Sequence, residues 1–357
     1  MQEKRSVFAI IVIAVPMAFA VTACKKSTPN TSADPNMDTD ARADTDTKSH
    51  SDTDTDTKSH SDTDTDTDTQ VDLDTTDTQV DLEATDAGGD ADTGQTVECP
   101  TPELQPGSDE IIEIEHDGMT RSYIVYVPEK VDPSQPAPLV LNWHGLFSSA
   151  AAQRRYAEGD RIAEEKSTIV AYPEGYGKAF NAGVCCGPFG NPSHKLDDVG
   201  FGRAIVEDIS SRICVDKKRV YSTGLSNGGS MSEWNACNAA DLYAAVAPVS
   251  ALGFSEIECE PSRPVPMIAF NGTADPLVSY RTSRRSISNW VERNGCRGDP
   301  QREDYGDSFC EVWSDCDENV EVVSCTINGM QHCWPGNPSA VLACSTGGLV
   351  DIDANRM

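Results

Sequence analysis

Short apolar runs alternate with amphipathic stretches over residues 99–357, and this alternation predicts a mixed α/β domain. Strands are predicted where β-branched, aromatic and aliphatic residues cluster, at 110–115, 121–127, 138–143, 168–172, around 220–221, at 244–249, 265–270 and 319–326. Helices are predicted at 149–166, 197–213, 230–237 and 282–294. Strands that alternate with helices and are apolar on both faces indicate a mainly parallel central sheet with helices on both faces.

The first residues of the chain depart from this pattern and resemble an export signal. Lys4 and Arg5 precede an apolar run at 7–21 that is short for a membrane span. Cys24 then follows a small-residue stretch, as in the lipobox of bacterial lipoproteins. We therefore predict a lipoprotein signal peptide at 1–23 and a lipidated Cys24 that anchors the protein to a membrane. An ordinary secretory signal with an incidental cysteine is the alternative.

The following segment is an acidic repeat without aromatic residues. TDTKSHSD occurs at 45–52 and again at 55–62, and residues 25–98 hold 21 acidic and five basic side chains, a net charge of −16. Such a composition cannot bury enough apolar surface to fold. Calcium binding is disfavoured because the repeat lacks the glycine and the terminal glutamate of a calcium loop. The predicted organisation is therefore a disordered, Asp/Thr-rich acidic stalk at 24–98 before a single domain at 99–357.

Charge and cysteine content narrow the class of protein further. The whole chain carries a net charge of −30 without a basic cluster, so nucleic acid is not an expected partner. Twelve cysteines follow Cys24, an even number that predicts disulfides in an exported domain. Their spacing lacks paired C-x-x-C units, and we expect no metal. The predicted location is the cell surface or outer membrane as a lipoprotein, or the extracellular space, and the predicted state is a monomer.

The strongest chemical motif is Gly224-Leu225-Ser226-Asn227-Gly228, placed between a predicted strand and a predicted helix. This arrangement is typical of a nucleophile elbow, in which a tight turn presents a serine hydroxyl at the edge of a sheet. The flanking glycines leave room for backbones to approach closely. Ser226 is therefore the candidate nucleophile.

A serine nucleophile needs a histidine base and a carboxylate that orients it. In α/β-hydrolases the chain order is serine, acid, histidine. Of the six histidines only His332 follows Ser226, so His332 is the candidate base. Several carboxylates follow the serine, and Asp275 alone lies just beyond the end of a clear strand. Asp275 is therefore the candidate acid.

Acyl transfer also needs N–H donors for the developing oxyanion. We expect the backbone N–H of Asn227, directly after the serine, and that of Leu146, in the loop after 138–143. The pocket beside Ser226 is expected to be lined by four further residues, Trp143, Cys185, Cys186 and Trp334.

Six ordered motifs together resemble the polyhydroxybutyrate depolymerase-like esterases, a group that includes secreted feruloyl and acetylxylan esterases. The motifs are LVLNWHG at 139–145, FNAGVCCG at 180–187, DDVGF at 197–201, RVYSTGLSNGGSM at 219–231, FNGTADPLVSY at 270–280 and GMQHCWPG at 329–336. The resemblance implies an α/β-hydrolase fold, a serine carboxylesterase activity without a cofactor, and the same three residues as catalytic triad. Cys333 stands where the family often has threonine, which suggests a bond to Cys344.

The predicted function is an extracellular serine carboxylic-ester hydrolase that works through an acyl-enzyme. Its expected substrate is a plant cell-wall ester or a hydroxyalkanoate ester. Two alternatives remain open, a serine peptidase on the same fold and a non-catalytic surface lipoprotein that binds through this fold.

Overall fold

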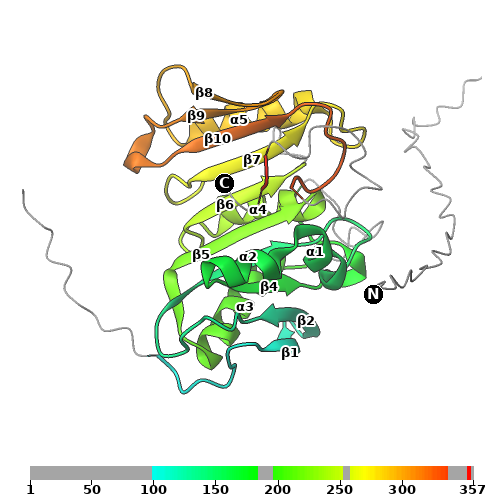
Figure 1. The fold of residues 1–357 in the computed structure, drawn as a ribbon, viewed down its shortest axis with the longest axis vertical. Coiled ribbons are helices and arrows are strands. Elements are labelled where there is room, and N and C mark those ends of the chain that lie inside the picture. Colours follow the sequence, from blue (N-terminus) through cyan, green and yellow to red (C-terminus); the bar gives the residue numbers. More distant parts are fainter. Residues whose placement is uncertain (1–98, 184–195, 252–257, 337–351, 355–357) are drawn as a thin grey trace, which may run out of the picture. The chain divides into compact units, whose positions relative to one another are not determined.

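A computed structural model describes residues 99–183, 196–251, 258–336 and 352–354, and these residues form one sheet with helices on both faces (Figure 1). The strands are β1 (Asp109–His116), β2 (Met119–Tyr126), β3 (Ala137–Trp143), β4 (Ile169–Pro173), β5 (Val215–Leu225), β6 (Ala245–Val249), β7 (Met267–Gly272), β8 (Gln301–Tyr305), β9 (Ser308–Trp313) and β10 (Val322–Ile327). The helices are α1 (Ala150–Ala157), α2 (Gly159–Lys166), α3 (Asp198–Arg212), α4 (Asn227–Asn238) and α5 (Tyr280–Arg293), with 3-10 turns η1 (Tyr176–Lys178) and η2 (Asp317–Asn319).

The ten strands lie in the order β1-β2-β4-β3-β5-β6-β7-β10-β9-β8. The six central strands, from β4 to β10, are parallel, and the strand pairings at each edge are antiparallel. The predicted mainly parallel sheet is confirmed. Because parallel strands all end at the same edge, the loops after β3, β5, β7 and β10 meet there.

The helices divide the domain into two apolar layers. Helices α3, α4 and α5 cover one face, where Phe201, Ile209, Met231 and Trp290 belong to the main core. Helices α1 and α2 cover the β3–β4 part of the opposite face, in front in Figure 1. Beyond α2 this face carries an apolar groove of about 310 Å³ over β5 and β6.

The predicted helix at 149–166 is in fact two helices, α1 and α2. Glu158 adopts a left-handed conformation with φ 46° and ends α1. Gly159 follows, and a Cβ placed there would lie 2.2 Å from the Tyr172 hydroxyl oxygen. The chain therefore turns at this point so that α2 can pack closely on β4. The residues on both sides favour a helix, so the sequence pattern predicts one continuous helix here.

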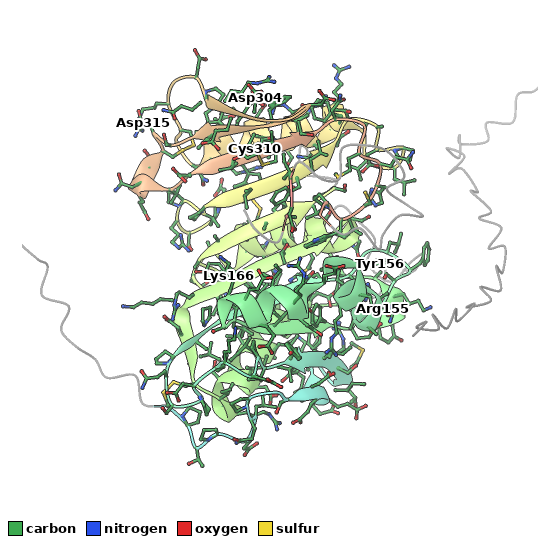
Figure 2. The ribbon with its side chains drawn as sticks, in the orientation of Figure 1. Arg155, Tyr156, Lys166, Asp304, Cys310 and Asp315 are labelled. Atoms are coloured by element: carbon green, nitrogen blue, oxygen red, sulfur yellow. A yellow bond between two sulfur atoms is a disulfide. The ribbon has the colours of Figure 1, made fainter. Side chains whose placement is uncertain are left out.

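The β8–β9 hairpin is an element that the apolar pattern does not predict. Its edge strand β8 has the sequence QREDY, and four of these five residues are exposed, so no alternation of apolar and polar positions marks it. Charged side chains on an edge strand discourage pairing with other chains. Figure 2 labels Asp304 on β8 and Asp315 just after β9, at this end of the sheet.

Four disulfides join described cysteines: Cys99–Cys214, Cys237–Cys259, Cys296–Cys316 and Cys310–Cys325. The last links β9 to β10 between directly opposed residues, and Cys310 is labelled in Figure 2. Cys333 is also disulfide-bonded, with a partner outside the described residues. The prediction of a disulfide-rich domain is confirmed. Among the described helices, none combines the length and the apolar character needed to cross a bilayer.

Helix α4 carries a buried carboxyl toward α5. Glu233 is 2% exposed, and its Oε2 accepts a hydrogen bond from Ser286 Oγ at 2.8 Å. Burial raises the pKa of this carboxyl to about 7, although the hydrogen bonds from Ser286 and Trp290 oppose the shift. Glu233 is therefore largely protonated in the folded domain at mildly acidic pH.

The raised pKa of Glu233 predicts a pH-dependent stability. Between about pH 4.5 and 7 the folded state binds more protons here than the unfolded state, so stability falls as pH rises through this window and then levels off. The loss should be on the order of 3 kcal/mol. In Glu233→Gln the free energy of unfolding, measured with urea at several pH values, should vary less over this window. Exposed Glu207→Gln on α3 is the control, and equal slopes in both variants would contradict the prediction.

The length of the closed loop predicts that Cys99–Cys214 stabilises the domain most among the four bonds between described cysteines. This bond spans 115 residues, whereas Cys296–Cys316 spans 20. Double replacement by serine should cost about 2–5 kcal/mol at either bond, and about 1–2 kcal/mol more for the longer loop. Urea unfolding without reductant measures both losses. Equal losses would show that loop length does not set the stabilisation here.

Candidate active site

The turn between β5 and α4 forms the strand–turn–helix geometry that the glycine–serine motif predicts. Ser226 has φ 59° and ψ −116°, and its backbone N–H donates to Val249 O at 2.9 Å. A Cβ on Gly224 would lie 2.5 Å from Trp143 O, and one on Gly228 only 2.0 Å from the same atom. Both positions therefore exclude any side chain, because the ends of β3 and β5 and the start of α4 touch through their backbones.

Asp275 and His332 form a hydrogen-bonded pair in the loops after β7 and β10. Asp275 Oδ2 lies 2.8 Å from His332 Nδ1, and the two side chains are 1% and 14% exposed. Asp275 Oδ1 accepts from the N–H groups of Leu277 and Val278 at 2.8 and 2.9 Å. A carboxylate can only accept, so Nδ1 carries the imidazole proton and Nε2 is the basic nitrogen.

The local hydrogen bonds keep this carboxylate charged. Burial alone would raise the pKa of Asp275, but the hydrogen bonds from His332 and from the backbone of Val278 and Leu277 outweigh it. The pKa therefore lies below its usual value. An ionised Asp275 at neutral pH fixes the tautomer and the orientation of His332.

The two loops that carry this pair are joined to each other. Ala274 N–H donates to Met330 O at 3.1 Å, and a Cβ on Gly272 would lie 2.1 Å from that same oxygen. Within the described contacts, no hydrogen bond joins Ser226 Oγ to His332. Contacts of this kind are often long in structures without substrate and tighten in the complex.

The loop after β3 lies directly against the serine. A Cβ on Gly145 would sit 3.5 Å from Ser226 Cβ. Ser148 N–H donates to Gly145 O at 3.0 Å, which closes a turn around Leu146 and Phe147. No hydrogen bond from the Leu146 N–H is found among the described residues. Asn227 is the first residue of α4, and N–H groups in a first helical turn favour negative charge.

His144 precedes this loop and is fully buried. Its Nδ1 lies 2.8 Å from Gly145 O, and its Nε2 accepts from Gly175 N–H at 2.9 Å. Burial lowers the pKa of the imidazole, which agrees with a neutral ring protonated on Nδ1. The α/β-hydrolase order leaves His144 without a role because it precedes Ser226. Its place beside the predicted oxyanion loop is the signal that could have marked it.

Both tryptophans expected in the pocket belong to the core, which corrects that prediction. Trp143 is fully buried and donates to Ser222 Oγ at 3.0 Å, on the face covered by α3 to α5. Trp334 is 2% exposed and packs with Phe270 beside the apolar groove on the other face. Sequence proximity to the site did not reveal the direction of either side chain. Cys185 and Cys186 lie outside the described residues.

Comparison with known proteins identifies relatives of this chain by sequence and by structure. No protein-family model matches it. It is 34% identical to feruloyl esterase B of Piromyces equi over 235 residues, which cover 59% of this chain and 42% of that protein. It is 29% identical to feruloyl esterase D of Neurospora crassa over 237 residues, which cover 62% of this chain and 76% of that protein.

Among solved structures, an acetyl xylan esterase from Aspergillus awamori matches with a TM-score of 0.51 at 14% identity, over 64% of this chain and 94% of that one. The structural match confirms the α/β-hydrolase fold. The sequence matches confirm the resemblance to feruloyl esterases, while the likeness to polyhydroxybutyrate depolymerases stays a prediction. The chain spans less than half of the Piromyces relative.

If Ser226 is a nucleophile, the Asp275–His332 pair predicts how far turnover falls when the carboxylate is replaced. Asp275→Asn preserves the size of the side chain, but its amide lets His332 adopt the wrong tautomer. Turnover of an activated ester should fall by about 10³–10⁴-fold, as is typical when a triad carboxylate becomes an amide. Steady-state kinetics measure the loss, and near-UV circular dichroism verifies the fold. Full activity in Asp275→Asn would exclude this carboxylate from the mechanism.

Proposed function

From an α/β-hydrolase fold and a sequence related to feruloyl esterases, we propose that this protein is a serine carboxylic-ester hydrolase. The observation that carries the proposal is the hydrogen bond between buried Asp275 and His332, at the sheet edge where the elbow presents Ser226. This pair leaves Nε2 of His332 as the basic imidazole nitrogen, which we propose serves Ser226. No metal or cofactor is invoked.

The mechanism assigns one role to each residue. His332 Nε2 takes the proton of Ser226 as Oγ attacks the ester carbonyl carbon, and Asp275 stabilises the imidazolium. The backbone N–H groups of Leu146 and Asn227 bind the oxyanion. The imidazolium then protonates the leaving alcohol, and an acyl-enzyme remains. Water, activated by the same imidazole, releases the acid and restores Ser226.

The proposed substrates are feruloyl or acetyl esters of plant polysaccharide. Relatives named feruloyl esterases and a structural neighbour named an acetyl xylan esterase support this class. Hydroxybutyrate esters are the second candidate, supported by the motif resemblance alone. A panel of methyl ferulate, acetylated xylan and hydroxybutyrate oligomers separates the three by kcat/KM.

We further propose that the protein is exported and tethered. The disulfides of the described domain suit an oxidising compartment. The signal peptide at 1–23, the lipid on Cys24 and the acidic linker fall outside the described residues and rest on the sequence. Metabolic labelling with a radioactive fatty acid tests the anchor, since Cys24→Ser should abolish incorporation.

The central test replaces the proposed nucleophile. Ser226→Ala should lower ester hydrolysis by about 10⁴–10⁶-fold and abolish covalent labelling by a fluorophosphonate probe. Ser250→Ala is a matched control. Ser250 follows β6, also has a positive φ (47°), and donates its N–H to the next strand at Phe270 O.

The control should keep both activity and labelling. Persistent activity in Ser226→Ala, or its loss in Ser250→Ala alone, would overturn the assignment. Peptide hydrolysis without ester hydrolysis would favour the peptidase alternative. A wild-type protein that neither hydrolyses nor reacts with the probe would favour a binding protein.

A further inference from the structure

We propose that residues 175–180, which follow β4, form a brace that fixes the two oxyanion donors relative to each other. His144 and Asn227 act as its positioning residues. The proposal rests on the esterase function above, and it adds His144, residues 175–180 and the side chain of Asn227 to the triad and the two backbone donors. Three sets of hydrogen bonds carry it.

The first link fixes the direction of the Leu146 N–H, because it holds the carbonyl oxygen of the same peptide group. His144 Nδ1 donates to Gly145 O, while its Nε2 accepts from Gly175 N–H at the start of the brace. In a trans peptide the C=O and the following N–H point in opposite directions. Holding Gly145 O toward the imidazole therefore turns the Leu146 N–H away from it.

The second link holds the far side of the same turn. Phe147 N–H donates to Lys178 O at 2.8 Å. Leu146 thus lies between two residues that are each tied to the brace, one through His144 and one through its own backbone. Rotation of the Gly145–Leu146 peptide would break at least one of these bonds.

The third link reaches the other donor. Asn227 Oδ1 accepts from Phe180 N–H at 2.8 Å, and Asn227 Nδ2 donates to Phe180 O at 3.0 Å. The Phe180 ring packs against the His144 ring with centroids 4.6 Å apart. Asn227, His144 and Phe180 are all fully buried, where hydrogen bonds are stronger and costly to break.

The brace itself is compact. Lys178 N–H donates to Gly175 O at 3.0 Å, and a Cβ on Gly175 would lie 2.6 Å from Ala179 O. One short segment therefore ties together two donors that belong to different strand ends. Preorganised donors stabilise a transition state only when they are held at the right position, and misplacement by about 1 Å can cost on the order of 10²-fold in rate.

The first experiment replaces Asn227 by alanine, which removes the side chain and keeps the backbone donor. Asn294→Ala is a matched control. Asn294 is also fully buried, and its amide makes the same two bonds to the N–H and C=O of Val265, before the start of β7. Both variants should lose similar stability in urea unfolding, because they lose equivalent hydrogen bonds.

The two variants should differ in kinetics with p-nitrophenyl acetate. Asn227→Ala should lower kcat by about 10–10²-fold with KM within about threefold, because the oxyanion is bound only in the transition state. Asn294→Ala should leave kcat unchanged. Equal kcat in the two variants would overturn the brace.

The second experiment tests the imidazole link. His144→Leu loses both hydrogen bonds, whereas His144→Asn places an amide donor near the position of Nδ1 and can still bind Gly145 O. The expected order of kcat is wild type, then Asn, then Leu, at similar KM. If His144→Leu and Asn227→Ala loosen one brace, their combined loss should be smaller than the product of the single losses.

A fully multiplicative double variant, or no rescue by asparagine, would show that the links act separately and would overturn the proposal. Where His144→Leu does not fold, the comparison of Asn227→Ala with Asn294→Ala decides alone. A different result would contradict the proposed function. The wild-type protein would then hydrolyse no ester, and the Ser226→Ala variant would be indistinguishable from it.

Discussion

The backbones of β3, β5 and α4 meet with no space between them, and the site depends on this contact. Gly224 and Gly228 both face the carbonyl oxygen of Trp143, where a Cβ would overlap it. The chain can pass this point only through a sharp turn, so Ser226 takes a backbone conformation that non-glycine residues rarely adopt. The same contact brings Gly145 against Ser226 and sets the starting position of the loop after β3.

Two histidines of this domain differ in their exposure and in their hydrogen-bond partners, although their side chains are identical. His332 has a carboxylate on one nitrogen, and its side chain is 14% exposed. His144 is sealed from solvent, and both of its ring nitrogens are engaged with backbone groups. One ring is therefore partly exposed and paired with a carboxylate, and the other is fixed by the backbone.

Local motifs predict the strand–turn–helix at Ser226 and the pairing of Asp275 with His332, because each depends on a few neighbouring residues. The elbow, the aspartate after β7 and the histidine after β10 are all short-range features that the strand–helix alternation places at one edge. The split between α1 and α2 falls at Glu158 and Gly159, and the close packing of Gly159 on Tyr172 is a tertiary contact that the sequence does not show. Strand β8 is polar because it lies at an edge, and the directions of Trp143 and Trp334 depend on which face of the sheet each meets.

The bond between Cys310 and Cys325 has a consequence for how this sheet comes apart. Edge strands usually detach first, one ladder at a time, and expose their neighbours. Here β9 is covalently tied to β10, the strand that leads to His332, so β9 cannot separate from β10 even after the edge strand β8 has detached. Any opening beyond β8 must carry β9 and β10 together, away from the parallel ladder of β7. Detachment of β9 becomes a larger and rarer event, and His332 is shielded from the fraying that terminal elements normally undergo.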